Sequence, residues 1–451
     1  MNGGFTISAQ KKLFLRYVIP SIAAMWVFSI YTIVDGFFVA KFVGEQTLSA
    51  INVVLPFING IFSIAILFST GTATLVGISL GENNHKKANA LFTFTTVVEL
   101  LFSIFLYVVC RLNITHLASF LGATPSIVSD VTTYLKIILL FNSFFIISYN
   151  LEVLVKTDGF PALATIGVLL SAFTNIFLDY LFVGVFHWGI SGAAWATGIA
   201  QVFSTALFMT HFLSKRSVLK FRSFEWDFKI YAKILFIGFG SFISEISTGV
   251  IIFLYNNHIV KVIGETGLIS YTVLSYINLF VSMSMIGLTQ GMQPLVSYYY
   301  GKKDPDSYHK FLKFSFIGIL GLSATFYVIT LLFRQQLTGI FIRAEHAELF
   351  AYTQRALFYF APSFLLIGFN LLISGYFASI GYAKHSLIIA IARGFLFIWI
   401  ALSVATYLQK DTLLWLSSFF SELITLLISI LLILSIMKKK NLSSINEEQT
   451  S

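Results

Sequence analysis

Charged residues and cysteine are both scarce in this chain of 451 residues. Only 11% of its residues are charged, whereas a soluble globular domain has roughly 25%. The single cysteine, Cys110, excludes an internal disulfide and a cysteine-based metal site. In place of charge, 57% of the residues are hydrophobic. This composition excludes a string of soluble domains and predicts a membrane protein.

The sequence also lacks the signatures of common enzyme sites. It contains no GxxxxGKS/T phosphate-binding loop and no HExxH zinc motif. Its few histidines lie scattered in or near the expected loops. We therefore expect no ATP hydrolysis, no enzymatic activity and no cofactor.

Apolar runs of about 20 residues or more, long enough to cross a bilayer, follow one another through the chain. They are too long for barrel strands, and backbone polar groups in lipid must be satisfied internally, so the runs are predicted to be helices. The expected fold class is an all-α polytopic membrane protein. Twelve spans are predicted, at 13–40, 50–80, 88–110, 127–156, 161–185, 189–213, 230–260, 267–299, 309–333, 352–380, 383–407 and 411–437.

The formal net charge of +9 could suggest a nucleic-acid surface, but its distribution argues otherwise. With the spans in place, 20 Lys and Arg residues fall on the side of the N-terminus and 8 on the other, while Arg393 lies inside a span. Positive charge marks the cytoplasmic side of a membrane protein. We expect a multi-pass protein of the cell membrane, in contact with its lipid, with both termini cytoplasmic and no bound nucleic acid.

Residues compared with those 220 positions later reveal an internal repeat. Matches at this or a slightly larger spacing include Gly44–Glu45 with Gly264–Glu265, Gly71 with Gly291, Gly81 with Gly301, and Gly159 with Gly381. Six spans separate the copies, so both halves have the same orientation. Transporters use such a parallel duplication to place a site between two lobes. We expect two pseudo-symmetric six-helix lobes with a path between them along spans one, two, seven and eight.

Four regions follow from this division. Residues 1–213 form an N-lobe and residues 230–437 a C-lobe. The segment 214–229 is the most polar internal stretch and is expected to be a cytoplasmic linker. Residues 438–451 are expected to form a cytoplasmic tail.

The first span contains two irregular residues, Pro20 and Asp35. A carboxylate inside a membrane span costs about 3 kcal/mol, so Asp35 is expected to face a partner or a watery cavity. About a turn and a half of apolar residues still follows it. The alternative is that Asp35 lies near the helix end, within reach of water among the headgroups.

The fifth span contains a second acid, Asp179, four residues after Asn175, so both side chains share one helix face. The repeat aligns Asp35 with Tyr255 and Asp179 with Ala401, so neither acid has a copy in the second half. Two acids with amide and hydroxyl oxygens suit a proton or a small hard cation. A packing role is the alternative for Asn175.

Other ionisable residues lie within or near the spans. Glu245 of span seven is a candidate to face the cavity. Arg393 is expected to pair or to reach the membrane surface. Glu152 and Lys156 have the spacing of a structural ion pair. Two other acids, Glu99 and Glu422, lie either inside their membrane spans or outside them, because the predicted span ends do not decide their position.

Six stretches in order resemble the multidrug and toxic compound extrusion (MATE) family, in its bacterial form. The resemblance runs from Leu13 to the last span. It implies twelve helices in two lobes and drug efflux driven by inward flow of protons or sodium. The stretches are IPSIAAMWVFSIYTIVDGFFVAKFVG, GTATLVGISLGENNHKKA, DGFPALATIGVLLSAFTNIFLDYLFV, GISGAAWATGIAQ, GLTQGMQPLVSYYYGKKD and GYFASIGYAKHS.

The resemblance assigns a coupling site in the N-lobe. Asp35 stands where the family has its first-helix acid, and Asn175 and Asp179 look like the polar pair of its fifth helix. Thr197 is similar to the sixth-helix threonine that completes a cation site, and Tyr134 resembles a nearby tyrosine. These residues are expected to hold the proton or the sodium ion.

Three further positions are compared with the family. Pro20 stands at its bend of the first helix, and Glu245 resembles the seventh-helix acid or amide of some branches. One branch of the family carries an acid on its tenth helix. This chain departs from that branch, because it has only Asn370 in the corresponding region. We expect Glu245 and Asn370 to face the substrate cavity.

The leading functional hypothesis is a secondary antiporter that exports lipophilic, often cationic small molecules. The alternative is a flippase for lipid-linked oligosaccharide precursors, which shares the two-lobe architecture but needs Arg and Lys for a pyrophosphate. A membrane scaffold without transport is a third reading, and the duplicated lobes argue against it. The transporter is expected to act as a monomer on organic substrates.

Overall fold

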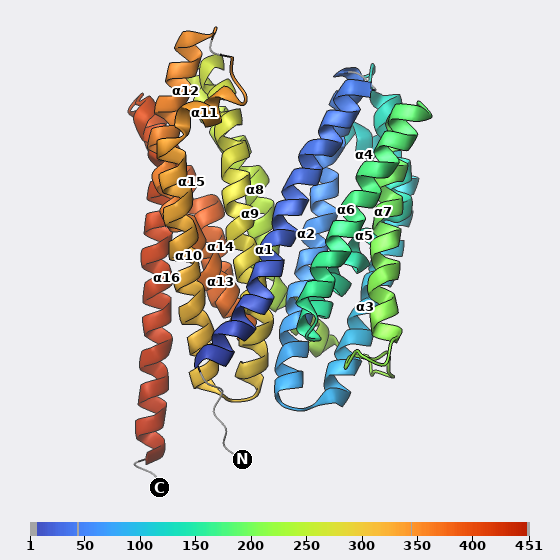
Figure 1. Cartoon of the computed structure of the whole chain (residues 1–451), viewed down its shortest axis with the longest axis vertical. Helices are drawn as coiled ribbons and strands as arrows, with labels where there is room; N and C mark the ends of the chain where they lie inside the picture. Colours follow the sequence, from blue (N-terminus) through green and yellow to red (C-terminus); the bar gives the residue numbers. More distant parts are fainter. Residues whose placement is uncertain (1–6, 43–44, 344, 449–451) are drawn as a thin grey trace.

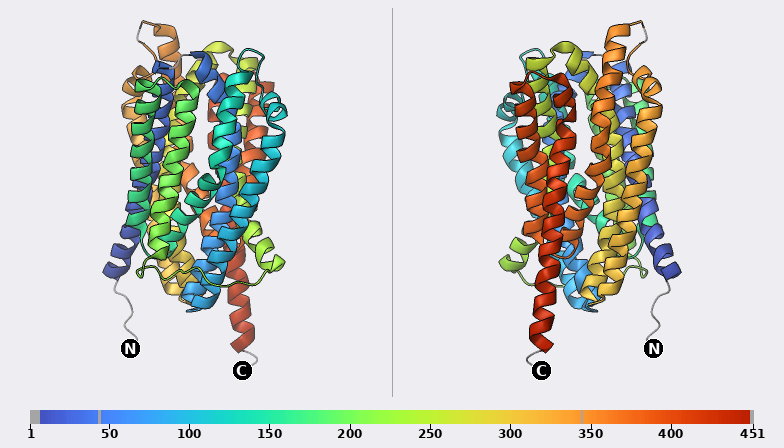
Figure 2. Two further views of the ribbon diagram at one scale, coloured as in Figure 1. Left: turned by 90° about the vertical axis from the view of Figure 1, so that its right-hand side faces the viewer. Right: turned by 90° about the vertical axis from the view of Figure 1, so that its left-hand side faces the viewer.

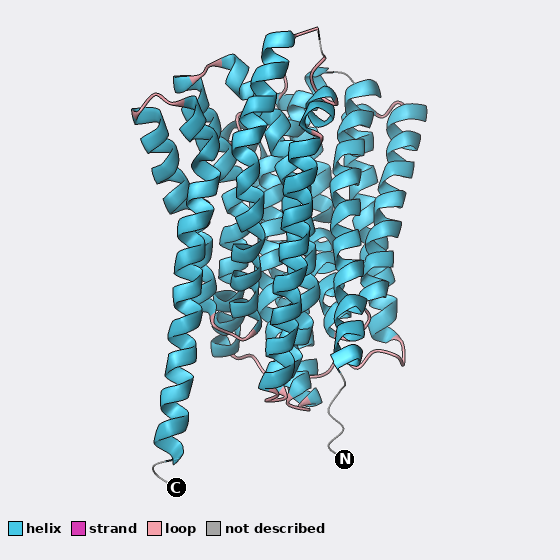
Figure 3. Cartoon of the chain, turned by 60° about the vertical axis from the view of Figure 1, so that its left-hand side comes forward, coloured by secondary structure: helices cyan, strands magenta, loops and turns pink. Residues whose placement is uncertain are grey.

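The structure is a computed structural model built of helices joined by turns and loops (Figure 3). It describes the backbone of residues 7–42, 45–343 and 345–448, and their side chains except those of 32–33, 35–42, 45–48 and 437–448. Within these ranges no strand occurs, and twelve helical segments are long and apolar enough to span a membrane. The predicted all-α class and the number of spans are therefore confirmed.

The helices form two groups that lie side by side in Figure 1, and we use N-lobe and C-lobe for them. The N-lobe contains α1 (Ile7–Phe42), α2 (Glu45–Gly81), α3 (His85–Leu112), α4 (Ile114–Phe120), α5 (Val128–Thr157), α6 (Pro161–Asp179), the π-helical turn η1 (Tyr180–Val185) and α7 (Gly189–Leu213).

The C-lobe contains α8 (Phe228–Val262), α9 (Glu265–Gly301), α10 (Pro305–Leu332), α11 (Arg334–Gly339), α12 (Ala347–Phe360), the 3-10 turn η2 (Ala361–Ser363), α13 (Phe364–Ser379), α14 (Ala383–Ile391), the π-helical turn η3 (Ala392–Leu396), α15 (Phe397–Tyr407) and α16 (Asp411–Glu448). The tenth span, predicted as one helix, is interrupted at η2, which contains Pro362. Proline lacks the N–H of a helical hydrogen bond and favours such a break.

Backbone turns recur at the spacing of the sequence repeat. Asn83 and Lys303, before α3 and α10, have φ values of 59° and 58°. Gly159 and Gly381, after α5 and α13, have φ values of 100° and 77°. Positive φ is uncommon outside glycine. Its recurrence at matched positions is the structural counterpart of the sequence duplication.

Helix α1 begins and α16 ends at the same end of the bundle, which we call the terminal end (Figure 2). There the lobes approach closely, whereas they spread apart toward the opposite, distal end (Figure 1). A Cβ at Gly238 of α8 would collide with the carbonyl oxygen of Leu67 in α2, and one at Gly81 of α2 with that of Tyr298 in α9. Glycine allows this approach because it has no side chain.

The linker between the lobes is attached to the N-lobe. Asp158, after α5, accepts hydrogen bonds from the backbone N–H groups of Val218 and Leu219, both at 3.0 Å. Its other carboxylate oxygen lies 2.8 Å from Nε2 of His211. Both side chains are buried. The polar linker is therefore a docked segment of defined conformation.

Candidate functional site

A cavity of about 1040 Å³ lies between the lobes. Small-molecule sites typically have roughly 300–1,000 Å³, so a large organic compound fits. On α1 the lining residues run from Met25 to Tyr31, distal to Tyr17 and Val18, which contact Gly291 of α9. On α9, however, the lining continues past Gly291 to Ser297, so the cavity extends from the distal part of the space between the lobes toward the terminal end. It is lined mainly by α2, α8 and α9, three of the four spans that the sequence predicted for a path, and to a smaller extent by α1, α5, α6, α7 and α13.

Three carboxylates and two cations line this cavity among the described residues: Glu152, Glu245, Glu422, Lys156 and Arg393. Lys156 Nζ lies 2.8 Å from Glu152 Oε1, which confirms the predicted ion pair. Arg393 Nη2 lies 2.9 Å from Glu422 Oε1. Within the described part of the chain, Glu245 has neither a hydrogen bond nor an ion pair. Among its described lining residues, the cavity therefore has one carboxylate in excess.

Glu245 belongs to a polar face of α8. Ser241, Ser244 and Thr248 also line the cavity, and their spacing around Glu245 places all four on one helix side. The sequence prediction that Glu245 faces the cavity agrees with this placement. Its carboxylate, surrounded by hydroxyl groups, can receive a cationic group of a ligand.

A polar link joins the lobes beside the N-lobe ion pair. Lys156 Nζ lies 3.4 Å from Oε1 of Gln290 in α9, and Gln290 Nε2 lies 3.3 Å from the Tyr149 hydroxyl in α5. The Lys156 side chain is only 1% exposed. This cation is thus held from both lobes.

The predicted coupling residues of α6 and α7 lie together. Asn175 Nδ2 is 3.4 Å from the Thr197 hydroxyl, and both residues line the cavity. Asn175 Oδ1 is buried and has no hydrogen-bond donor among the described residues. Asp179, one turn further along α6, is fully buried. An unused amide oxygen beside a hydroxyl fits a small cation, because such ions prefer oxygen ligands.

Two other residues of the predicted site differ in position. Tyr134 is buried in the hydrophobic core of the N-lobe and does not line the cavity. Asp35 belongs to α1, but its side chain lies outside the described residues. Asn175 and Thr197 are therefore in contact, and Asp179 lies one turn from Asn175 on α6. The contacts of Asp35 stay a prediction.

Pro20 lies inside α1, and the helix continues through it. The Thr165 hydroxyl of α6 donates to the Pro20 carbonyl oxygen at 2.8 Å. This bond ties the first helix to the helix that carries Asn175 and Asp179. A bend at Pro20 stays a prediction from the resemblance.

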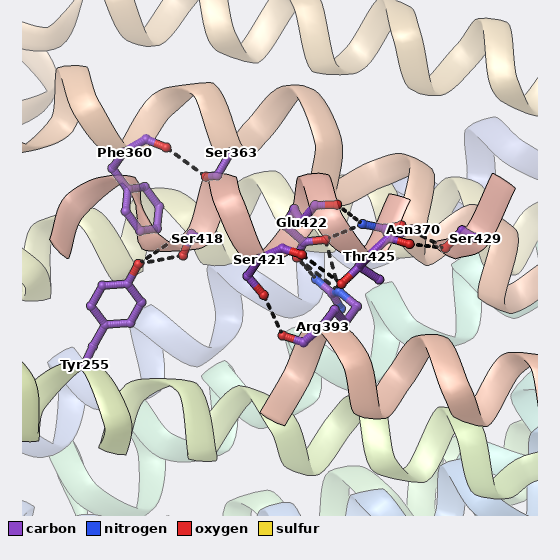
Figure 4. Close-up of polar contacts among 10 residues, drawn as sticks. All are labelled: Tyr255, Phe360, Ser363, Asn370, Arg393, Ser418, Ser421, Glu422, Thr425 and Ser429. Atoms are coloured by element: carbon purple, nitrogen blue, oxygen red, sulfur yellow. Dashed lines mark hydrogen bonds and ion pairs between the residues drawn. The ribbon is translucent and has the colours of Figure 1, made fainter. Parts of the chain in front are cut away.

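A charged network occupies the core of the C-lobe (Figure 4). Arg393 Nε and Nη2 donate to Glu422 Oε1 at 3.1 and 2.9 Å. From α13, Asn370 Nδ2 donates to Glu422 Oε2 at 2.7 Å. Asn370 is fully buried and does not itself line the cavity, contrary to the prediction, because it lies against Glu422 and Ser429. The comparison with the family found no acid near Asn370 on the tenth span. In the structure Glu422 of α16 supplies an acid at this place.

The position that aligns with Asp35 in the second lobe has a hydroxyl group instead of an acid. The Tyr255 hydroxyl of α8 lies 2.7 Å from that of Ser418 in α16 and accepts the backbone N–H of Ser418 at 3.1 Å (Figure 4). Tyr255 is fully buried. The second lobe therefore has no carboxylate at the position that matches Asp35.

Comparisons with known proteins agree with this architecture. The multidrug export protein MepA of Staphylococcus saprophyticus is 26% identical over 392 residues, which cover 86% of each chain. MepA of Staphylococcus aureus is 23% identical over 402 residues with the same coverage. A solved structure described as the outward-facing conformation of a multidrug resistance MATE family transporter of the MOP superfamily has a TM-score of 0.89 at 21% identity, over 95% of this chain and 97% of the other.

A MOP superfamily transporter from Pyrococcus furiosus, described by a reversed polarity of its binding pocket, has a TM-score of 0.87 at 20% identity, over 94% of each chain. The MatE family model matches residues 20–181 and 240–404, well over half of the chain and parts of both lobes. This chain belongs to the MatE family, a family of membrane transporters and not of enzymes.

Proposed function

We propose that this chain is a secondary antiporter that exports lipophilic organic cations in exchange for protons or sodium ions. One observation supports this most directly: among the described residues the cavity between the lobes is lined by three carboxylates but two cations, and of these carboxylates Glu245 has neither a hydrogen bond nor an ion pair. A desolvated carboxylate favours an organic cation, because the charges attract strongly at low dielectric constant. The relatives named for multidrug export support the same function.

The alternative, a flippase for pyrophosphate-linked lipids, is less consistent with the charges in the cavity. An anionic headgroup needs unpaired Arg or Lys side chains. Here Lys156 and Arg393 are each neutralised by a glutamate of the same lobe. We therefore retain cation export as the proposed function.

The charge count of the sequence supports a cytoplasmic terminal end, so the cavity would face the outside. Under this proposal, a membrane-impermeant maleimide added outside intact cells should label a cysteine at Ser282, a cavity residue, in a Cys110-free protein. Gly238→Leu should reduce this labelling several-fold, because its side chain would collide with Leu67 and separate the lobes at the terminal end.

Gly321→Leu is the matched control for this experiment. Gly321 lies at an exposed position of α10 outside the cavity, and a Cβ there meets no atom within 4 Å. Equal labelling of both leucine variants would contradict a conformational role for the close contact at Gly238. Labelling only from the inside would contradict the proposed orientation.

Transport can be tested with a fluorescent lipophilic cation in vesicles under separately imposed sodium and proton gradients. Glu245→Gln should weaken the apparent affinity for the cation about tenfold, which corresponds to about 1.4 kcal/mol. The affinity for a neutral compound of similar size should change little, because only the charge is removed. Glu348→Gln, at an exposed site of α12 outside the cavity, provides the control. Unchanged cation affinity in Glu245→Gln would exclude this carboxylate as the anchor.

A further inference from the structure

The C-lobe network contains a carboxylate that is held independently of its cation (Figure 4). Asn370 Nδ2 donates to Glu422 Oε2 at 2.7 Å and to the backbone oxygen of Glu422 at 2.8 Å. The Ser429 hydroxyl lies 3.1 Å from Asn370 Oδ1 and fixes the amide in turn. None of these bonds involves Arg393. The Glu422 carboxylate is therefore positioned whether or not the guanidinium is present.

Arg393 is attached at one edge only. Its hydrogen-bonded side-chain atoms, Nε and Nη2, both donate to Glu422. A guanidinium has five N–H groups, and the others have no hydrogen bond within the described part of the chain. Arg393 also lies on the π-helical turn η3, and such turns within α-helices are frequent at functional sites.

The two cavity cations differ in how firmly they are held. The Lys156 side chain is 1% exposed, whereas that of Arg393 is 12% exposed. Lys156 is also within hydrogen-bond distance of Gln290 in the other lobe. Arg393 is thus the cation that can leave its carboxylate with the smaller rearrangement.

The turn that carries Arg393 packs against α8, because a Cβ at Gly394 would collide with the side chain of Ser247. Arg393 and Glu245 also line the same cavity, and Glu245 has no hydrogen bond or ion pair among the described residues. A displaced guanidinium would therefore stay in a cavity that contains a second carboxylate.

We propose that Glu422 is a substrate subsite for planar cations with paired N–H donors, namely amidines and guanidines. In the absence of substrate, Arg393 occupies this subsite. This inference rests on the proposed export of organic cations. An amidinium makes the same bidentate hydrogen bonds to a carboxylate as a guanidinium, so it replaces Arg393 without leaving Glu422 unpaired. A cation without N–H groups cannot make this exchange.

The test is equilibrium binding to the purified full-length protein in lipid nanodiscs at pH 8. The two probes are diamidinophenylindole, a fluorescent bis-amidine, and tetraphenylphosphonium, which has no N–H group. Arg393→Gln should strengthen diamidinophenylindole binding about tenfold and Glu422→Gln should weaken it about tenfold, since charge-assisted bidentate pairs are strong. In the Glu422→Gln background, Arg393→Gln should add little, because both changes act on one interaction.

Arg355→Gln is the matched control, because Arg355 pairs with Asp411 at 3.6 Å outside the cavity and should leave binding unchanged. Arg393→Lys keeps the charge but loses the bidentate geometry, and it should also strengthen amidine binding if Arg393→Gln folds poorly. Binding of both probes by the wild-type protein, with amidine affinity unchanged or weakened in the Arg393 variants, would overturn the subsite alone. Failure of every variant to bind either cation would overturn the proposed function and the subsite together.

Discussion

Exchanging Asp179 for asparagine should abolish most cation-coupled efflux and leave the protein folded. Asp179 is fully buried inside a membrane span, one turn from Asn175. A buried carboxylate is costly unless a proton or a cation neutralises it, so its occupancy can respond to the ion gradient. Asparagine keeps the shape of the side chain and loses the charge. We expect efflux to fall by more than about tenfold, measured in vesicles with an imposed gradient.

Asp35→Asn should have the same effect if the two acids form one coupling unit, as the sequence predicts. The double variant should then be little worse than either single variant, because residues that act as a unit are non-additive. Asp306→Asn, at an exposed site in the first turn of α10, is the matched control. Robust ion-driven efflux by the double variant would show that coupling depends on other groups, with Glu245 the next to test.

Replacing Arg393 by methionine should strongly destabilise the C-lobe. The Arg393 side chain is 12% exposed and the Glu422 side chain 8% exposed, so the change leaves a buried carboxylate without its cation. Breaking such a pair typically costs about 3–5 kcal/mol. The measurement is the thermal unfolding midpoint of the purified protein in detergent.

The double variant, Arg393→Met with Glu422→Gln, should recover most of the lost stability. Glutamine keeps an oxygen for Asn370 and carries no charge, so the desolvation penalty disappears. Arg355→Met removes an exposed ion pair, with side chains 59% and 37% exposed, and should cost less than about 1 kcal/mol. Equal destabilisation in the single and double variants would indicate that Arg393 acts through packing rather than charge.

Local sequence was sufficient to predict the spans. Each apolar run must satisfy its own backbone hydrogen bonds in lipid, so length and composition alone gave twelve helices. The largest difference at a helix start is in the first span, predicted from residue 13 and observed from Ile7. The interruption of the tenth span at Pro362 was missed, although proline was its signal.

Polar partners within one helix were also predictable. Glu152 and Lys156 are four residues apart, and that spacing brings side chains together in any α-helix. Asn175 and Asp179 share a face for the same reason. Thr197 was placed beside Asn175 only through the family resemblance, because no local pattern relates α6 to α7.

The sequence by itself determined the membrane-spanning helices, the duplicated order of turns and the unequal placement of Asp35 and Asp179. Only the tertiary structure decided that Glu422 of α16, Asn370 of α13 and Arg393 of η3 form one network. The three residues lie on separate helices, and helix packing determines which of their side chains meet. The same applies to the cavity and to Glu245, which has no hydrogen bond or ion pair among the described residues, because distant parts of the chain provide the neighbours that pair a charge.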